Sequence, residues 1–212
     1  MRLILVRHGE VEVPRPRTFY GGSEVPLSAA GRLEAQRAAE ALRPLRLDHV
    51  ACSPLSRARF GAERLAEHRA LAQPLQLLDA LREIHRGRWV GLTAEEIAER
   101  WPGDLDAHAA DPVDWRGHEG ESLADLRDRV LGARDQLARD WHGGTVAVVA
   151  HLYPIRAMVA DALHRPLQDW ERLKAPTGSI TVLSGTPVGW VVEAVGWKPE
   201  PGEALQRLPL GL

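Results

Sequence analysis

The first nine residues, MRLILVRHG, constrain the fold of this chain most strongly. Residues 3–6 are all apolar, and a short run of this kind is typical of a central strand that is covered on both faces. Arg7 and His8 follow the run directly. We therefore expect a buried strand that ends abruptly and carries a guanidinium and an imidazole to the rim of a sheet.

Two further apolar runs end in a similar way. Residues 49–52 and 145–150 are predicted to be strands. A helix that carries Arg57 in its first turn follows the former, and His151 follows the latter directly. Ligands of parallel sheets bind beyond the carboxyl ends of the strands. We therefore expect Arg57 and His151 to meet the two basic residues of the first strand at one edge.

Strands alternate with helices along the chain, which predicts an α/β sandwich with a mostly parallel sheet. Capping residues and helical spacing predict the helices. Their expected ranges are 28–43, 53–68, 93–101, 122–142 and 153–163. Residues 102–120 are rich in Asp, Pro, Gly and His and are expected to form a surface excursion. Two late strands, 180–183 and 190–195, follow, and we expect an antiparallel pair.

Composition excludes several classes of protein. The chain has 212 residues and a net charge of −2, so no general attraction to nucleic acid or anionic membrane is expected. The single cysteine, Cys52, cannot form an internal disulfide. Neither a signal peptide nor a run of ~18 apolar residues is present, which predicts a cytoplasmic protein. We expect one domain over residues 1–212, with a loosely attached tail at 199–212.

Two arginines, two histidines and a helix N-terminus suit a multiply charged anion, because guanidinium groups and free N–H donors bind phosphate oxygens. A neutral imidazole among such cations can act as a nucleophile towards phosphorus. Glu83, in an irregular stretch, is the best candidate for the acid that protonates the leaving group. Taken singly, each residue has an ordinary structural explanation, and the hypothesis depends on their coincidence at strand ends.

Alternation along a strand would send Arg7 and His8 to opposite faces of the sheet. For both side chains to enter one pocket, we expect the strand to break at about Val6. Gly9 is expected to permit the turn that follows.

Residues 5–10, LVRHGE, resemble the opening motif of the histidine phosphatase superfamily, also called the phosphoglycerate-mutase-like family. Further segments resemble motifs of the same family and occur in the same order. They are residues 25–31, 53–58, 81–83, 87–93, 120–122 with 129–130, and 150–151.

The resemblance implies a three-layer α/β/α fold with a single mixed sheet. It implies that His8 becomes transiently phosphorylated, and that Arg7, Arg57 and His151 hold the phosphate. Glu83 would donate a proton to the leaving group and later help to activate water. No metal or cofactor is expected.

The loop after the first motif departs from the family pattern. Pro14 stands where the family often has an Asn that helps to bind phosphate. Arg17, Thr18 and Tyr20 are candidates to replace that contact. Two further substrate-binding candidates lie elsewhere. Leu152 follows the second histidine, where Gly is common. Arg86 replaces a usual Phe and is expected either to reach a second anionic group of the substrate or to be an ordinary exposed arginine.

The pattern is most similar to the short phosphatase branch, which includes α-ribazole phosphatases and broad-specificity enzymes. It predicts a metal-independent phosphomonoesterase that acts through a phosphohistidine on a small phosphorylated metabolite. Two alternatives stay open: a cofactor-dependent phosphoglycerate mutase, and a non-catalytic module that binds a phosphorylated ligand. The expected partner is a small phosphomonoester, without nucleic acid or membrane, and a homodimer is left open.

Overall fold

The computed structural model describes residues 1–67, 69, 71 and 73–205. Within these ranges a single six-stranded sheet forms the centre of the molecule, in the order β3-β2-β4-β1-β5-β6. The strands are β1 (Arg2–Arg7), β2 (His49–Cys52), β3 (Gln76–Leu77), β4 (Thr145–Ala150), β5 (Ile180–Thr186) and β6 (Gly189–Trp197). The first four of these in spatial order run parallel, and β5 and β6 are antiparallel to their neighbours. The predicted mixed, mostly parallel sheet is confirmed.

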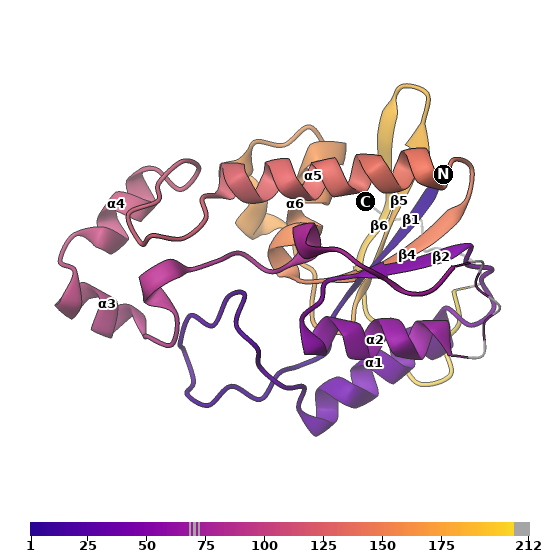
Figure 1. Ribbon diagram of the computed structural model, residues 1–212, viewed down its shortest axis with the longest axis horizontal. Helices are drawn as coiled ribbons and strands as arrows, with labels where there is room; N and C mark the ends of the chain where they lie inside the picture. Colours follow the sequence, from indigo (N-terminus) through magenta and orange to yellow (C-terminus); the bar gives the residue numbers. More distant parts are fainter. Residues whose placement is uncertain (68, 70, 72, 206–212) are drawn as a thin grey trace.

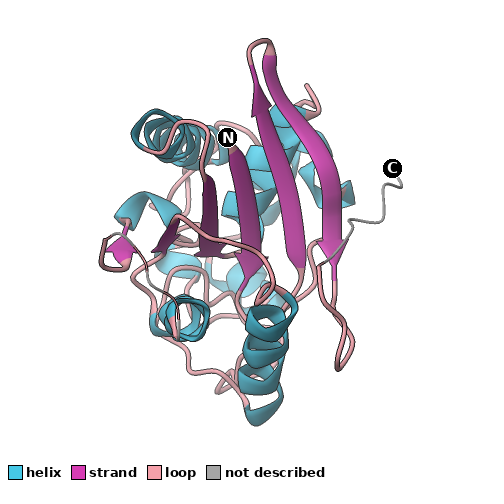
Figure 2. Ribbon diagram, turned by 90° about the vertical axis from the view of Figure 1, so that its right-hand side faces the viewer, coloured by secondary structure: helices cyan, strands magenta, loops and turns pink. Residues whose placement is uncertain are grey.

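Helices cover both faces of the sheet. They are α1 (Ala29–Ala41), α2 (Ser56–Ala66), α3 (Ala94–Arg100), α4 (Asp104–Ala110), α5 (Leu123–Asp140) and α6 (Leu152–Ala162). Helices α1 and α2 lie on one face and α5 and α6 on the other, whereas α3 and α4 stand away from the sheet at one end (Figure 1). Figure 2 shows helices on both sides of the strands. The three-layer α/β/α arrangement is therefore confirmed.

The alternation of side chains in β1 divides the core between the two faces. Leu3 and Leu5 pack with residues of α5 and α6, whereas Ile4 and Val6 pack with residues of α1 and α2. All four side chains are buried, as expected for a strand covered on both faces. Strand β1 is thus held from both sides, which gives its carboxyl end a rigid base.

Side-chain caps begin three of the predicted helices. The Ser28 hydroxyl accepts a hydrogen bond from the backbone N–H of Gly31, and capping boxes start α3 at Thr93 and α5 at Ser122. The sequence also predicts that Ser53 caps the helix expected over 53–68. This is wrong, because α2 begins at Ser56 and its N-cap residue, Leu55, makes no side-chain cap hydrogen bond. Residues 53–55 instead carry the chain from the edge of the sheet to the helix.

The segment 102–120 is more ordered than the sequence predicts. It contains α4 and the short link that returns the chain to α5. The rings of Trp89, Trp115 and His118 meet here, with centroids 4.9 to 5.1 Å apart, and Trp89 is buried. Helix α4 has seven residues and buries none of them, so its apolar spacing carries no helical signal.

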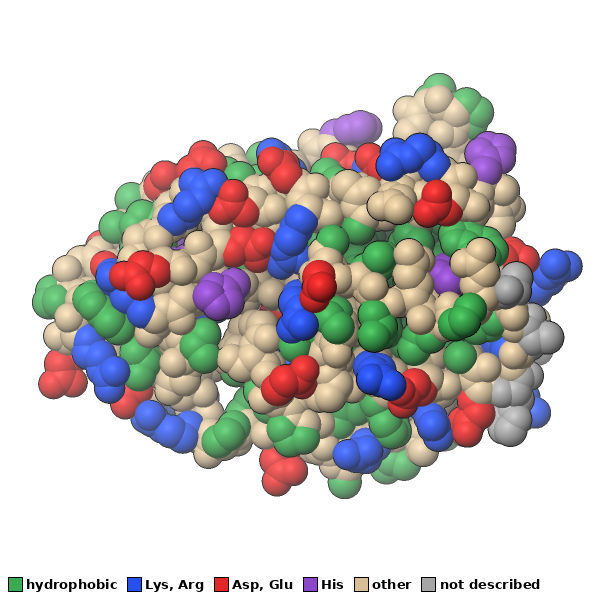
Figure 3. All heavy atoms as spheres, viewed as in Figure 1, with side chains coloured by type: hydrophobic (Ala, Val, Ile, Leu, Met, Phe, Trp, Pro, Cys, Tyr) green, Lys and Arg blue, Asp and Glu red, His purple; other side chains and the backbone are tan. Residues whose placement is uncertain are grey.

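The described part of the predicted tail reaches the body of the protein at Leu205. The backbone N–H of Leu205 donates to the carbonyl of Ala41, and its side chain packs against the core on the α1 side. Residues 206–212 lie outside the described residues, as does the predicted helix end at His68. Among the residues that are described, no helix is both long and apolar enough to cross a membrane. Acidic and basic side chains are interspersed over the face in Figure 3.

Candidate active site

Three parallel strands end at nearly the same level of the sheet. Arg7 is paired with Ala150, and Cys52 with Val149. The residues that follow these strands, His8, Ser53 and His151, therefore emerge at one edge. This is the edge at which open α/β sheets bind their ligands.

The expected strand break at Val6 is wrong. Strand β1 continues through Arg7, and the backbone N–H of His8 still donates to the carbonyl of Ala150 at 3.0 Å. The neighbouring strand β4 extends to Ala150, and its backbone groups hold β1 in register to that point. Because the strand ends directly after Arg7, both side chains lie at the edge of the sheet, where the charge of Arg7 acts on His8.

Gly9 serves a close approach and not a turn. Its φ is not in the left-handed region, since Gly9 is absent from the glycines with positive φ. A Cβ atom at Gly9 would lie 2.0 Å from the carbonyl oxygen of Gly31, near the start of α1. The glycine therefore allows the loop after His8 to lie directly against the helix.

His8 is poised as a neutral nucleophile. Its Nδ1 lies 2.6 Å from the carbonyl oxygen of Gly9. A carbonyl only accepts hydrogen bonds, so Nδ1 carries the proton and Nε2 keeps its lone pair. Burial and, after it, the charges of Arg57 and Arg7 together lower the pKa of His8 to about 3, although the hydrogen bond to Gly9 opposes this. At neutral pH the ring is therefore uncharged, with an unprotonated Nε2.

Arg57 and Arg7 bring fixed positive charge to His8. Arg57, the second residue of α2, donates from Nη1 to the carbonyl of Ser23 at 2.6 Å and from Nη2 to that of Gly21 at 2.9 Å. Arg7 donates from Nη1 to the carbonyl of Ala175 at 2.7 Å. The Nε atoms of both arginines are buried and have no hydrogen-bond partner among the described residues. Buried donors of this kind suit an anionic ligand, because an unpaired buried donor is unfavourable.

His151 faces His8 across the edge, with ring centroids 5.0 Å apart. Its Nε2 lies 2.8 Å from the Ser53 hydroxyl, and its Nδ1 has no partner within the described ranges. Burial, followed by the neighbouring imidazole and the charge of Arg57, holds the pKa of His151 well below its usual value. Ser53 therefore orients this ring and is a site residue that the sequence assigned to another role.

Glu83 is a buried carboxyl held by backbone donors. Its Oε1 accepts hydrogen bonds from the N–H groups of Ile84 at 3.0 Å and Tyr153 at 3.2 Å. Burial raises the pKa of Glu83, and these hydrogen bonds and the charges of Arg7 and Arg57 oppose that rise. A raised pKa keeps a proton available on this carboxyl, which is what a general acid requires.

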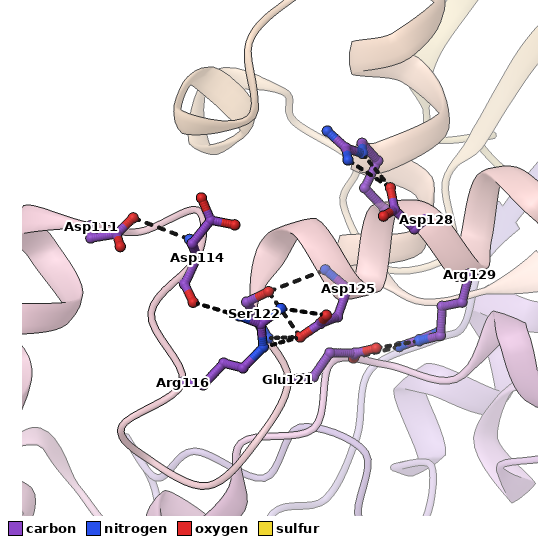
Figure 4. Close-up of polar contacts among 9 residues, drawn as sticks. Asp111, Asp114, Arg116, Glu121, Ser122, Asp125, Asp128 and Arg129 are labelled. Carbon is purple, nitrogen blue, oxygen red and sulfur yellow. Dashed lines mark hydrogen bonds and ion pairs between the residues drawn. The ribbon is translucent and has the colours of Figure 1, made fainter.

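An ion pair holds the loop that carries Glu83. The Glu121 carboxylate binds Arg129 of α5, with Oε2 2.8 Å from Nη2 (Figure 4). Arg129 also donates to the carbonyl of Ala80 at 2.6 Å, before Glu83 in the chain. Glu121 in turn accepts from the backbone N–H of His85 at 3.3 Å, after Glu83. The pair therefore fixes the loop on both sides of the acid.

Of the three loop residues predicted to bind substrate, Arg17, Thr18 and Tyr20, only Tyr20 is shown to lie beside the site. The ring of Tyr20 lies 5.5 Å from the guanidinium carbon of Arg57, so Tyr20 is beside the site. The Thr18 hydroxyl donates to the carbonyl of Arg15 within its own loop, and Arg17 is exposed. Neither is brought into contact with His8, and the substrate role of both stays a prediction.

Two further candidates lie in or against α6. Leu152, its first residue, is half-buried and packs against the core under α5 and α6. Arg86, in the loop that carries Glu83, is buried against aromatic rings, so the alternative of an ordinary exposed arginine is wrong. The sequence analysis did not identify Tyr153 as a site residue. Its backbone N–H donates to Glu83, and a backbone contact cannot be recognised from the type of side chain. Among the described residues, no group of three or more His, Cys, Asp or Glu side chains is arranged to hold a metal ion.

Comparison with known proteins agrees with this geometry. A sequence model described as the histidine phosphatase superfamily (branch 1) matches residues 3–198. Phosphoserine phosphatase 1 of Hydrogenobacter thermophilus is 33% identical over 187 residues, which cover 86% of this chain and 86% of that protein. Mycobacterial glucosyl-3-phosphoglycerate phosphatase matches with a TM-score of 0.79 at 30% identity, over 94% of this chain and 99% of that one. The α-ribazole phosphatase of Shigella flexneri has a TM-score of 0.85 at 22% identity, over 96% and 100% of the two chains, which concerns the fold alone.

Proposed function

Since this chain belongs to branch 1 of the histidine phosphatase superfamily, we propose that His8 is its nucleophile and Glu83 its general acid. The enzyme is a phosphatase that hydrolyses phosphoric monoesters through a phosphohistidine. The observation that supports the assignment of His8 is its hydrogen bond to Gly9, which leaves Nε2 unprotonated in a ring that burial keeps neutral.

In the first step, Nε2 of His8 attacks phosphorus and the bond from phosphorus to the ester oxygen breaks. Glu83 gives its proton to the leaving oxygen, so the product alcohol departs neutral. Charge on the phosphoryl oxygens is stabilised by Arg7, Arg57 and His151. Phosphoryl transfer depends mainly on positioning and electrostatic stabilisation of this kind.

In the second step, water attacks the phosphorus of the phosphohistidine. The Glu83 carboxylate, now without its proton, takes one from the attacking water, as microscopic reversibility requires of a group that was the acid. The bond from phosphorus to Nε2 breaks and inorganic phosphate leaves. His8 returns to its neutral form and Glu83 to its protonated form, so the cycle closes.

The proposal for His8 is tested by trapping the intermediate. Wild-type protein is mixed with a ³²P-labelled phosphomonoester and quenched, and the bound label is followed in acid and in base. We expect label that is lost in acid and kept in base, as for phosphohistidine. The His8→Ala protein should bind no label and release no phosphate, whereas His142→Ala, at an exposed histidine, should behave as wild type. Label that survives acid, or turnover by His8→Ala, would refute the assignment.

The substrate is proposed to be a small phosphorylated metabolite, as the printed names of the relatives suggest for those proteins. Release of inorganic phosphate from 3-phosphoglycerate with a trace of the bisphosphate indicates hydrolysis, and formation of 2-phosphoglycerate would indicate a mutase. The near-balanced charge supports an enzyme that does not act on nucleic acid, and a cytoplasmic location stays a prediction. A homodimer stays a prediction that gel filtration tests.

A further inference from the structure

Arg86 is a buried arginine with no acidic partner. Its residue is 6% exposed, and no hydrogen bond or ion pair joins its side chain to any described residue. Arg134 is buried to a similar degree and forms ion pairs with Asp135 and Asp161. Buried arginines are normally paired, because the charge loses its hydration on burial. Arg86 therefore differs from Arg134, which has acidic partners, and from Arg57, which donates to two backbone carbonyls.

Aromatic rings surround the Arg86 guanidinium. Its central carbon lies 4.9 Å from the ring centroid of Tyr153 and 5.9 Å from that of Phe19. Contact with ring faces stabilises the cation and leaves the N–H groups at its edge for other acceptors. Arg156 also lies against Tyr153, at 5.6 Å, but it donates to the carbonyl of Leu173. The two arginines beside this ring thus differ in their hydrogen bonding.

His118 lies near Arg86 and does not supply a negative charge. Burial, followed by the charge of Arg86, lowers the pKa of His118 to about 4. The ring of His118 is therefore neutral at physiological pH and offers no negative charge. Among the described residues, the Arg86 guanidinium therefore forms no ion pair with a carboxylate.

Arg86 adjoins the active site through two of its walls. Gly21, whose carbonyl accepts from Arg57, packs so closely on Arg86 that a Cβ there would lie 3.0 Å from Arg86 Cγ. Tyr153, on which the guanidinium rests, donates its backbone N–H to Glu83. Arg86 also follows Glu83 by only three positions. The unpaired cation is therefore fixed beside the catalytic acid and the phosphate-binding arginine.

We propose that Arg86 binds a carboxylate of the substrate, so that the natural substrate is a small phosphorylated hydroxy acid or amino acid. A planar carboxylate matches the N–H edge of a guanidinium in a bidentate pair. The inference rests on the proposed phosphatase function, because the phosphate of the same molecule must lie at His8. Arg86 then sets specificity, while the phosphate is held by the residues at the sheet edge.

The test compares substrates that differ only in the carboxylate. kcat/KM is measured for phosphoserine against phosphoethanolamine and for 3-phosphoglycerate against glycerol 3-phosphate. We expect wild-type enzyme to prefer the carboxylate in each pair, and Arg86→Gln to lower that preference about 10- to 100-fold, the range for a lost hydrogen bond to a charged group. Arg86→Lys should keep part of it. Because the readout is a ratio within one protein, partial loss of folded enzyme cancels.

Arg127→Gln is the matched control, since it removes the same charge from a half-exposed arginine on α5 that pairs with Asp128. It should leave both ratios at the wild-type value. A wild-type enzyme without preference for the carboxylate, or a preference that Arg86→Gln leaves intact, would overturn the proposal. A stronger effect of Arg86→Gln on fructose 1,6-bisphosphate than on either carboxylate substrate would overturn it as well.

A binding measurement separates this proposal from the proposed function. Titration calorimetry on His8→Ala protein, with and without Arg86→Gln, compares the affinities of 3-phosphoglycerate and glycerol 3-phosphate. If wild-type enzyme hydrolyses none of the four substrates, the proposed function fails. Selective weakening of 3-phosphoglycerate binding would then still support the Arg86 site, and equal weakening of both ligands would refute it.

Discussion

The replacement Glu83→Gln separates proton donation from every other property of the site. The Glu83 Oε1 atom accepts hydrogen bonds from the backbone N–H groups of Ile84 and Tyr153. An amide oxygen can accept the same two hydrogen bonds, so the amide keeps the position of the carboxyl. What is lost is an acid that can give a proton to the leaving oxygen.

The size of the effect follows from the role of that proton. A positioned general acid contributes about 10²- to 10⁴-fold, which is about 2.7 to 5.4 kcal/mol in activation free energy. We therefore expect kcat/KM to fall by this factor for an alkyl phosphomonoester such as glycerol 3-phosphate. Nitrophenolate leaves without protonation, so 4-nitrophenyl phosphate should lose less than about tenfold. The assay is steady-state phosphate release with both substrates.

Stability provides the internal control for Glu83→Gln. The pKa of Glu83 is raised above its usual value of 4.5 in the folded state. As pH rises above that value, the unfolded chain releases the proton before the folded one does, and the wild type loses stability. The glutamine variant has no such loss and should be more stable than wild type in mildly alkaline buffer. Equal loss of activity on both substrates, or a variant that unfolds more readily there, would refute the assignment of Glu83 as a buried acid.

Further predictions concern the other groups at the edge. Ser53→Ala leaves Nε2 of His151 unpaired, so urea titration should show about 1–3 kcal/mol less stability, with reduced kcat/KM. Because the pKa of His8 is lowered to about 3, its nucleophilic form persists at mildly acidic pH, and kcat/KM should fall chiefly as the pH rises and Glu83 loses its proton. The same shift means that the unfolded chain binds a proton below its usual 6.5 whereas folded His8 does not, so acid unfolding should weaken in His8→Ala. EDTA should leave the rate of phosphate release unchanged, and strong inhibition would contradict the metal-free mechanism.

The local sequence determined most of the architecture. The apolar runs that became β1 and β4 are buried on both faces, and such runs have few other folded environments. Ser28, Thr93 and Ser122 start helices through hydrogen bonds to residues three positions away, so these signals are complete within a short segment. Helix α4 escaped prediction because it buries no side chain and has no side-chain cap.

The sequence by itself also determined which residues meet at the sheet edge. His8 and His151 directly follow the parallel strands β1 and β4, and the register of these strands places them together. The partners of those residues were decided only by tertiary structure. Ser53 binds a histidine 98 positions away, and no local pattern distinguishes that role from a helix cap. The proton position on His8 depends on a carbonyl placed by the close contact of Gly9 with Gly31.

Arg86 shows the same division most clearly. The sequence places Arg86 three positions after Glu83. It is compatible with either an exposed arginine or one that binds a second anionic group of the substrate. The folded chain buries its charge between Phe19 and Tyr153, residues more than 60 positions distant on one or the other side. Burial and missing countercharge depend on segments that only the folded protein brings together. The residue types at the strand ends therefore determined the class of reaction. Tertiary packing decided the protonation states of the site residues and, as we propose, the substrate specificity of the enzyme.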